Sequence, residues 1–244
     1  MRALLLSDIE IEREEIIMAI PIHVGSPRDR AQDIIVLLRH ATAGLPEPAG
    51  LQIIQEYGRN PFLILVACLL SLRTKDTTSL PVSRALFQYA QTPQELLALP
   101  LAQLETIIFA AGFYRQKAKT LHEVAQVLIE KFGGIVPHTE KELLSIKGIG
   151  RKTANLVLGE AFQIPSICVD VHVHRISNRL GLVKTETPEQ TEEWLKYVLP
   201  QENWIEINRL LVKWGQHVCL PVRPQCSRCA LEQICPRFGV KKSR

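Results

Sequence analysis

The sequence predicts an all-α protein, and two observations carry that prediction. From Leu51 onwards, apolar residues recur at helical spacing, and Pro, Gly, Thr and Asn residues punctuate the pattern. No run alternates apolar and polar residues in the way that half-buried strands do. The chain has 244 residues, of which 46% are apolar, so it can bury the core of one large domain or of two smaller ones.

Capping motifs mark several helix starts. Ser26-Pro27 predicts a helix that covers residues 29–39. Residues 92–95 (Thr-Pro-Gln-Glu) and residues 187–190 (Thr-Pro-Glu-Gln) are capping boxes with proline at the first helical position, so a helix is expected after each threonine. The sequence LPEPAG at residues 45–50 predicts a linker.

Apolar content predicts two further helices. Residues 62–72 are apolar nearly all round, which indicates a buried helix. Residues 1–25 show no strong pattern, although residues 10–17 can form a helix, and we expect a loosely held arm there. Residues 202–218 carry large apolar side chains at helical spacing, which we interpret as a core stripe: Trp204, Ile207, Leu210, Leu211 and Trp214.

A glycine hairpin between two helices is expected in the second half of the chain. Residues 139–142 (Thr-Glu-Lys-Glu) read as a capping box, so a short helix should run through Ile146 and end at Gly148 and Gly150. A second helix should begin at Arg151. Glycines at alternate positions permit a tight turn, and the new helix presents backbone N–H groups that suit a phosphate. The alternative is an ordinary turn between core helices.

Two residues beside this hairpin are candidates for chemistry. Lys152 follows Arg151 in the first turn of the predicted helix, where the helix dipole and the neighbouring cation both disfavour a charged ammonium. A neutral amine is a nucleophile that can form a Schiff base, although the lysine can also simply contact phosphate. Asp170 precedes a helical stretch at residues 171–180, which predicts an N-cap. A carboxylate held there also suits the stabilisation of a cationic sugar or the relay of a proton.

The cysteines divide into two isolated residues and one cluster. Cys68 and Cys168 lie in apolar surroundings and are expected to be buried thiols. The other four follow the spacing Cys-x6-Cys-x2-Cys-x5-Cys, and four thiolates in one short loop suit zinc or an iron–sulfur cluster. Zinc ribbons generally use two Cys-x2-Cys pairs, of which this loop has one. The candidate ligands are Cys219, Cys226, Cys229 and Cys235.

Two motifs carry a family resemblance. GIGRKTAN at residues 148–155, which includes Lys152, and VDVHVHR at residues 169–175, which includes Asp170, resemble the endonuclease III branch of the helix-hairpin-helix DNA glycosylases. The resemblance extends over residues 29–236. The order of the four clustered cysteines also matches the [4Fe-4S] loop of that family, which implies a [4Fe-4S] cluster as the cofactor.

The resemblance implies a domain organisation that composition alone leaves open. Two all-helical domains are expected, with DNA lying across the cleft between them. The implied divisions are an N-terminal extension at residues 1–25, an iron–sulfur cluster domain from residues 26–51 and 164–244, and a six-helix barrel domain with the helix-hairpin-helix at residues 52–163.

The implied activity is that of a bifunctional DNA glycosylase and AP lyase in base excision repair. Such an enzyme removes oxidised pyrimidines such as thymine glycol, and cleaves 3′ to the abasic site by β-elimination. Lys152 would attack C1′ of the damaged nucleotide, and Asp170 would assist base departure and proton transfer. The alternatives are a monofunctional mismatch or adenine glycosylase, whose family members generally lack the lysine, and a non-catalytic iron–sulfur DNA-binding protein.

An enzyme of this kind must extrude the target nucleotide and fill the gap with a side chain. Residues 71–76 resemble the segment that supplies this wedge, usually glutamine in bacterial members but Arg73 here. Phe113 is a second intercalation candidate, with a return to the core as its alternative. In the cysteine loop, whose implied role is to meet the phosphate backbone, Arg223 is the expected DNA contact. The hairpin contributes Gly148, Gly150 and Arg151.

Charge and terminal composition are compatible with these expectations. The net charge is +4 and the sequence pI about 8.8, a mild basicity that fits nucleic-acid binding and many other functions. The chain has no run of about 20 apolar residues that would span a membrane. Its first residues lack the features of a secretory signal, and their acidic residues argue against a transit peptide. We therefore expect a monomer in the cytoplasm, associated with the nucleoid, that binds double-stranded DNA containing damaged bases or abasic sites and no membrane.

Overall fold

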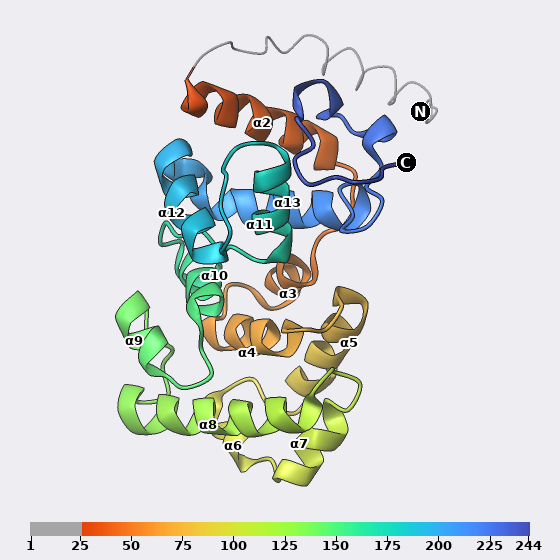
Figure 1. Cartoon of the computed structure of the whole chain (residues 1–244). Helices are drawn as coiled ribbons and strands as arrows, with labels where there is room; N and C mark the ends of the chain where they lie inside the picture. The colour runs from red at the N-terminus through yellow and green to blue at the C-terminus, as the bar shows by residue number, and fades with distance from the viewer. Residues whose placement is uncertain (1–25) are drawn as a thin grey trace, which may run out of the picture. The chain divides into compact units, whose positions relative to one another are not determined.

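The computed structural model describes residues 26–244, and it confirms the all-α prediction. Within that part of the chain, all regular structure is α-helix or short 3-10 helix (Figure 1). The residues cluster into two compact units, Glu47–Cys168 and a second unit in which residues 26–46 join Val169–Arg244. The expected divisions fell at residues 52 and 164. The predicted arm at residues 1–25, with its helix at residues 10–17, lies outside the described residues.

The unit Glu47–Cys168 is assembled around helix α4 (Pro61–Ser71), which is buried on nearly all sides. Asn60 caps this helix by accepting hydrogen bonds from the backbone of Phe62 and Leu63, and proline occupies the first turn. Its neighbours α3, α5, α8 and α10 all pack against it. The unit contains α3 (Ala49–Tyr57), α4 (Pro61–Ser71), α5 (Asp76–Phe87), α6 (Pro93–Ala98), α7 (Leu101–Ile107), α8 (Tyr114–Phe132), α9 (Glu140–Ser145) and α10 (Arg151–Phe162).

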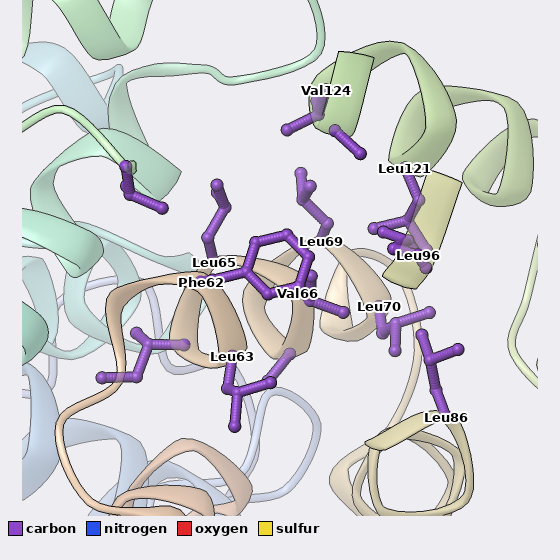
Figure 2. Close-up of a cluster of buried hydrophobic side chains, with 14 of the residues drawn as sticks. Phe62, Leu63, Leu65, Val66, Leu69, Leu70, Leu86, Leu96, Leu121 and Val124 are labelled. Atoms are coloured by element: carbon purple, nitrogen blue, oxygen red, sulfur yellow. The ribbon is translucent and has the colours of Figure 1, made fainter. Parts of the chain in front are cut away.

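Helix α4 confirms the buried helix predicted at residues 62–72. Figure 2 shows its side chains pointing outward in several directions, each toward apolar residues of other helices. Leu86 comes from α5, Leu96 from α6 and Leu121 from α8, and all are essentially inaccessible to solvent. A helix that is apolar all round needs such a shell, because it has no face to leave in water.

The second unit is formed by segments from both ends of the described chain. Its first helix packs against α13 and α12, and burial of its apolar face holds it there. The guanidinium of Arg39 also pairs with the Glu206 carboxylate at 2.6 Å. The unit contains α2 (Pro27–Thr42), α11 (Val171–Arg179), α12 (Pro188–Val198), α13 (Trp204–His217) and the 3-10 helices η1 (Gln201–Asn203), η2 (Cys226–Arg228) and η3 (Glu232–Ile234).

Of the three predicted capping boxes, those at Thr92 and Thr187 are confirmed and the one at Thr139 is corrected, while Ser26, predicted as a helix cap, also forms a full box. Ser26, Thr92 and Thr187 each form the reciprocal pair of bonds. At Thr139 the hydroxyl accepts from the backbone N–H of Glu142 but also donates to its carboxylate at 2.6 Å. Because the carboxylate binds the hydroxyl, this start is a simple N-cap and not a full capping box.

Two predicted boundaries are also corrected. Helix α9 ends at Ser145, so Ile146 is the C-cap and not a helical residue, although its side chain is buried as expected. Helix α3 begins at Ala49, inside the linker predicted at residues 45–50. Helix ends shift in this way because the last turn is held by few backbone bonds.

Candidate functional site

The hairpin between α9 and α10 has the backbone geometry that its glycines predict. Gly148 has a φ of +97°, and a β-carbon at that position would lie 2.6 Å from the methyl carbon of Thr120. Gly150 is the extended N-cap of α10. Both glycines are exposed, whereas Ile149 between them is buried. The two glycines place no side chain of their own over the exposed backbone at the start of this helix, which is the arrangement that suits a phosphate.

Lys152 lies in the first turn of α10, on a backbone fixed from the far side of the helix. The Cys168 thiol lies 3.5 Å from the carbonyl oxygen of Lys152. One turn further on, the side-chain amide of Asn155 donates to the carbonyl of Ile167, and the Ser166 hydroxyl donates to the carbonyl of Asn155. These bonds hold the extended segment after α10 along that helix, so the helix turn that carries the lysine has little freedom to shift.

Asp170 is the N-cap of α11, as predicted. One carboxylate oxygen, Oδ1, accepts the backbone N–H groups of His172 at 2.8 Å and Val173 at 2.9 Å. The second carboxylate oxygen takes no part in the cap. Asp170 belongs to the second unit and Lys152 to the unit Glu47–Cys168. Along the chain, only Val169 lies between Asp170 and Cys168, the residue bonded to the Lys152 carbonyl.

The four clustered cysteines line one cavity in the second unit, where α11, α13 and the C-terminal loops meet. The remaining lining is largely apolar and includes Ile176, Leu180 and Trp214. The Arg179 guanidinium donates to the Cys219 sulfur at 3.4 Å, and the Cys235 thiol donates to the Arg179 carbonyl at the same distance. All four cysteines are free of disulfide bonds and half-buried.

This donor set fits an iron–sulfur cluster chemically. Burial raises the pKa of the Cys229 thiol to about 12, so an adjacent metal ion is needed to hold it as a thiolate ligand. Within residues 26–244, no group of three or more His, Cys, Asp or Glu side chains is arranged to hold a metal ion. The fit therefore rests on the four soft donors that share one cavity and on their spacing along the chain.

Cys68 and Cys168, predicted to be buried thiols, are both buried, and neither forms a disulfide bond.

The two wedge candidates meet on the surface of the unit Glu47–Cys168. The Arg73 guanidinium lies over the Phe113 ring, 5.7 Å from its centroid, in the geometry of a cation–π contact. Phe113 is 66% exposed, which excludes the alternative of a return to the core. Arg223, in the cysteine loop, is also exposed. Arg73, Phe113 and Arg223 all have left-handed backbones, with φ of 54°, 59° and 52°.

Sequence analysis missed Lys117, a buried lysine beside these loops. Its side-chain ammonium donates to the Leu70 carbonyl at 2.6 Å and to the Thr74 hydroxyl at 2.7 Å. Burial lowers the pKa of Lys117 from 10.5 to about 8. A signal for it was present, because Lys117 lies at helical spacing at the N-terminal end of a buried stripe of α8 whose other members are apolar: Ala118, Leu121, Val124, Ala125 and Leu128.

Comparisons with known proteins are consistent with this geometry. A family model described as "HhH-GPD superfamily base excision DNA repair protein" matches residues 66–201. Endonuclease III of Thermotoga maritima is 45% identical over 194 residues, which cover 78% of this chain and 91% of that protein.

Two solved structures that are 33% identical to this chain also match it. A non-covalent endonuclease III–DNA complex has a TM-score of 0.75 and covers 85% of this chain and 95% of its own. A trapped endonuclease III–DNA covalent intermediate, an estranged-adenine complex, has a TM-score of 0.72 and covers 84% and 95%.

Among the helices of residues 26–244, none combines the length and the apolar character needed to cross a membrane.

Proposed function

Because this chain belongs to the HhH-GPD superfamily of base excision DNA repair proteins, and within it to the endonuclease III family, we propose that it removes oxidised pyrimidines such as thymine glycol and cleaves DNA 3′ to the abasic site. It is a bifunctional DNA glycosylase and AP lyase. The observation that carries the proposal is a lysine at the start of the hairpin helix, with Asp170 two residues beyond the thiol that contacts the lysine carbonyl.

Lys152 is the nucleophile in this proposal. Its neutral amine attacks C1′ of the damaged nucleotide, the N-glycosidic bond breaks, and the base leaves with the bonding electron pair and is protonated by water. Asp170 stabilises positive charge on the sugar and takes the proton that the lysine nitrogen loses. The C1′–O4′ bond then breaks as the nitrogen lone pair forms the Schiff base, and O4′ receives the proton from Asp170. The protonated Schiff base acidifies C2′, so loss of a C2′ proton expels the 3′ phosphate and cuts the strand.

The hairpin and the exposed arginines hold the DNA. Gly148, Gly150 and Arg151 bind phosphate at the start of α10, and Arg223 binds phosphate from the cysteine loop. Arg73 and Phe113 fill the space that the extruded nucleotide leaves. We assign the hairpin unit as the six-helix barrel domain and the second unit as the iron–sulfur cluster domain. The protein acts as a monomer in the cytoplasm, on the double-stranded DNA of the nucleoid.

Cys219, Cys226, Cys229 and Cys235 would hold a [4Fe-4S] cluster. Bound there, the cluster would hold the C-terminal loops together, and base removal would be left to Lys152 and Asp170. The other side chains that line this cavity are apolar except for Arg179, Gln225, Glu232 and Arg237. The Arg179 guanidinium also donates to the Leu220 and Pro221 carbonyls. The loop that carries Arg223 is thus fixed from two sides.

Replacement of one ligand tests the cluster. Cys229→Ser is expected to lose most of the bound iron and the broad visible absorbance of the cluster, and to lower the melting temperature, because a metal site contributes its binding free energy to folding. Iron content, absorbance and thermal unfolding are measured on the full-length protein. Cys68→Ser, a buried cysteine in the other unit, is the matched control and should keep its iron. Bound zinc without visible absorbance in the parent protein would contradict the assignment.

Borohydride trapping tests the activity as a whole. The protein is incubated with duplexes that contain thymine glycol or an abasic site, borohydride is added, and the adduct is digested and mapped. We expect a covalent adduct at Lys152 with both substrates, since borohydride reduces the Schiff base to a stable amine. If the protein binds these duplexes and forms no adduct, the lyase assignment is wrong and a monofunctional glycosylase or a DNA-binding protein takes its place.

A further inference from the structure

Two exposed side chains on separate loops form one surface feature in the unit Glu47–Cys168. Arg73 follows α4 and Phe113 is the N-cap of α8, and the guanidinium of the first lies over the ring of the second. Both residues have left-handed backbones, a conformation that residues with a β-carbon adopt at an energetic cost. Such a cost persists only where the surrounding structure enforces the conformation.

The loops also contact each other through their backbones. A β-carbon at Gly112 would lie 3.2 Å from the carbonyl oxygen of Arg73 and 3.5 Å from the Thr74 hydroxyl oxygen. Backbone atoms of one loop therefore lie against the other, so a shift in either loop displaces its partner.

Lys117 is the residue that connects both loops. Its backbone N–H donates to the Phe113 carbonyl at 3.0 Å, which connects Lys117 to the loop that carries Phe113. Its ammonium donates to the carbonyl of Leu70 and to the hydroxyl of Thr74, so it binds on both sides of Arg73. One side chain thus spans the base of the Arg73–Phe113 pair.

Packing alone does not explain a lysine at this buried position. Lys117 is 8% exposed, and burial lowers its pKa to about 8, so its charged form is disfavoured at this site. An apolar residue would continue the buried stripe of α8 without that cost. The charge-assisted hydrogen bonds from the Lys117 ammonium to Leu70 and Thr74 compensate for the cost of burying the charge. These bonds fix the position of the loop that carries Arg73.

We propose that Lys117 is a positioning residue that holds Arg73 and Phe113 together as one composite wedge for opening the DNA duplex. This proposal rests on the proposed function of the site. Lys117 does not touch the DNA in this scheme. It acts through the two loops, so its loss should impair only those steps in which a base is unstacked.

The test compares substrates that need the wedge with one that does not. Lys117→Met is assayed in the full-length protein on a thymine glycol duplex with 2-aminopurine next to the lesion, and on a single-stranded abasic oligonucleotide. We expect duplex excision and the 2-aminopurine fluorescence increase to fall about tenfold, the effect of losing a charge-assisted hydrogen bond. Cleavage of the single strand should stay near that of the parent. Lys119→Met, an exposed lysine on the same helix, is the control.

A double-mutant cycle separates positioning from general stability. In an Arg73→Ala, Phe113→Ala background, adding Lys117→Met should cause little further loss of duplex activity, because the wedge is already absent. Thr74→Val removes one bond from the opposite loop and should reproduce the selective loss even if Lys117→Met folds poorly.

Three outcomes would overturn the proposal: additive losses in the cycle, equal losses on duplex and single strand, or parental fluorescence in Lys117→Met. If the parent itself fails to cleave the abasic single strand, the lyase function fails. The 2-aminopurine comparison would still decide the role of Lys117.

Discussion

Lys152→Gln is expected to abolish strand cleavage at thymine glycol and at abasic sites while the protein still binds both duplexes. Glutamine keeps much of the length of the side chain but has no nucleophilic nitrogen, so no Schiff base can form. Loss of a nucleophile of this kind reduces turnover by on the order of 10⁴-fold or more. Cleavage is followed by gel electrophoresis under single-turnover conditions, and binding by fluorescence anisotropy.

Lys147→Gln provides the charge-matched control for this substitution. Lys147 lies on the same hairpin, it is 88% exposed, and its ammonium pairs with the Glu123 carboxylate at 3.3 Å. The control removes one positive charge from the hairpin that we propose binds DNA, without removing the proposed nucleophile. Cleavage by Lys152→Gln at the rate of Lys147→Gln would refute the assignment and favour a role in phosphate contact alone.

Asp170→Asn is expected to slow base removal by about 10²- to 10⁴-fold, the usual range for a group that transfers a proton in the transition state. The stability of the protein should change little. Asparagine caps helices as well as aspartate does, and its amide oxygen can accept the two backbone bonds that Oδ1 accepts now. Base release from a thymine glycol duplex and thermal unfolding are measured on the same preparation.

Asp170→Ala separates the two roles of this residue. It removes the cap as well as the charge, so it should slow base removal to a similar extent and also destabilise the protein by about 1 kcal/mol. A parental rate in Asp170→Asn together with a lower melting temperature in Asp170→Ala would show that Asp170 is a cap and nothing more.

Local features of the fold could be predicted from sequence because the interactions that produce them span three or four residues. The caps at Ser26, Thr92 and Thr187 each join a side chain to the backbone three positions ahead. Asp170 was predicted as an N-cap on the same grounds. The hairpin glycines follow the same logic, since a positive φ at Gly148 is a property of one residue.

Features that depend on distant segments were missed or misplaced. The bonds from Lys117 reach residues 47 and 43 positions away, and no local pattern names such partners. The left-handed backbone of Arg73 was not predicted either, although residues 71–76 were recognised as the segment that supplies the wedge. At Thr139 the interaction is local, but the same two residues allow two arrangements. The Glu142 carboxylate can accept a hydrogen bond from the Thr139 backbone N–H, as in a capping box, or from the Thr139 hydroxyl, as observed. The sequence is the same in both cases and cannot distinguish them.

Side-chain hydrogen bonds hold residues 163–168, the segment after α10, within the unit Glu47–Cys168. Periodicity marks the end of the helix near Phe162. Asn155 and Ser166 then tie the following residues back along α10, which places them with the hairpin up to Cys168. These bonds come from buried polar side chains, and the division expected at residue 164 came from the family resemblance, which does not take them into account.

The discontinuous second unit also sets an order of events during synthesis. Helix α2 leaves the ribosome before the other described helices, but the segments that it contacts are synthesised much later. Arg30 binds the carbonyls of Leu180 and Ile234, which are 150 and 204 residues away. The unit Glu47–Cys168 contains its own core and can fold while the apolar face of α2 is still exposed to solvent. The nascent chain therefore completes the lysine-bearing half before the cysteine loop exists, and α2 lacks its packing partners until Ile234 has been synthesised.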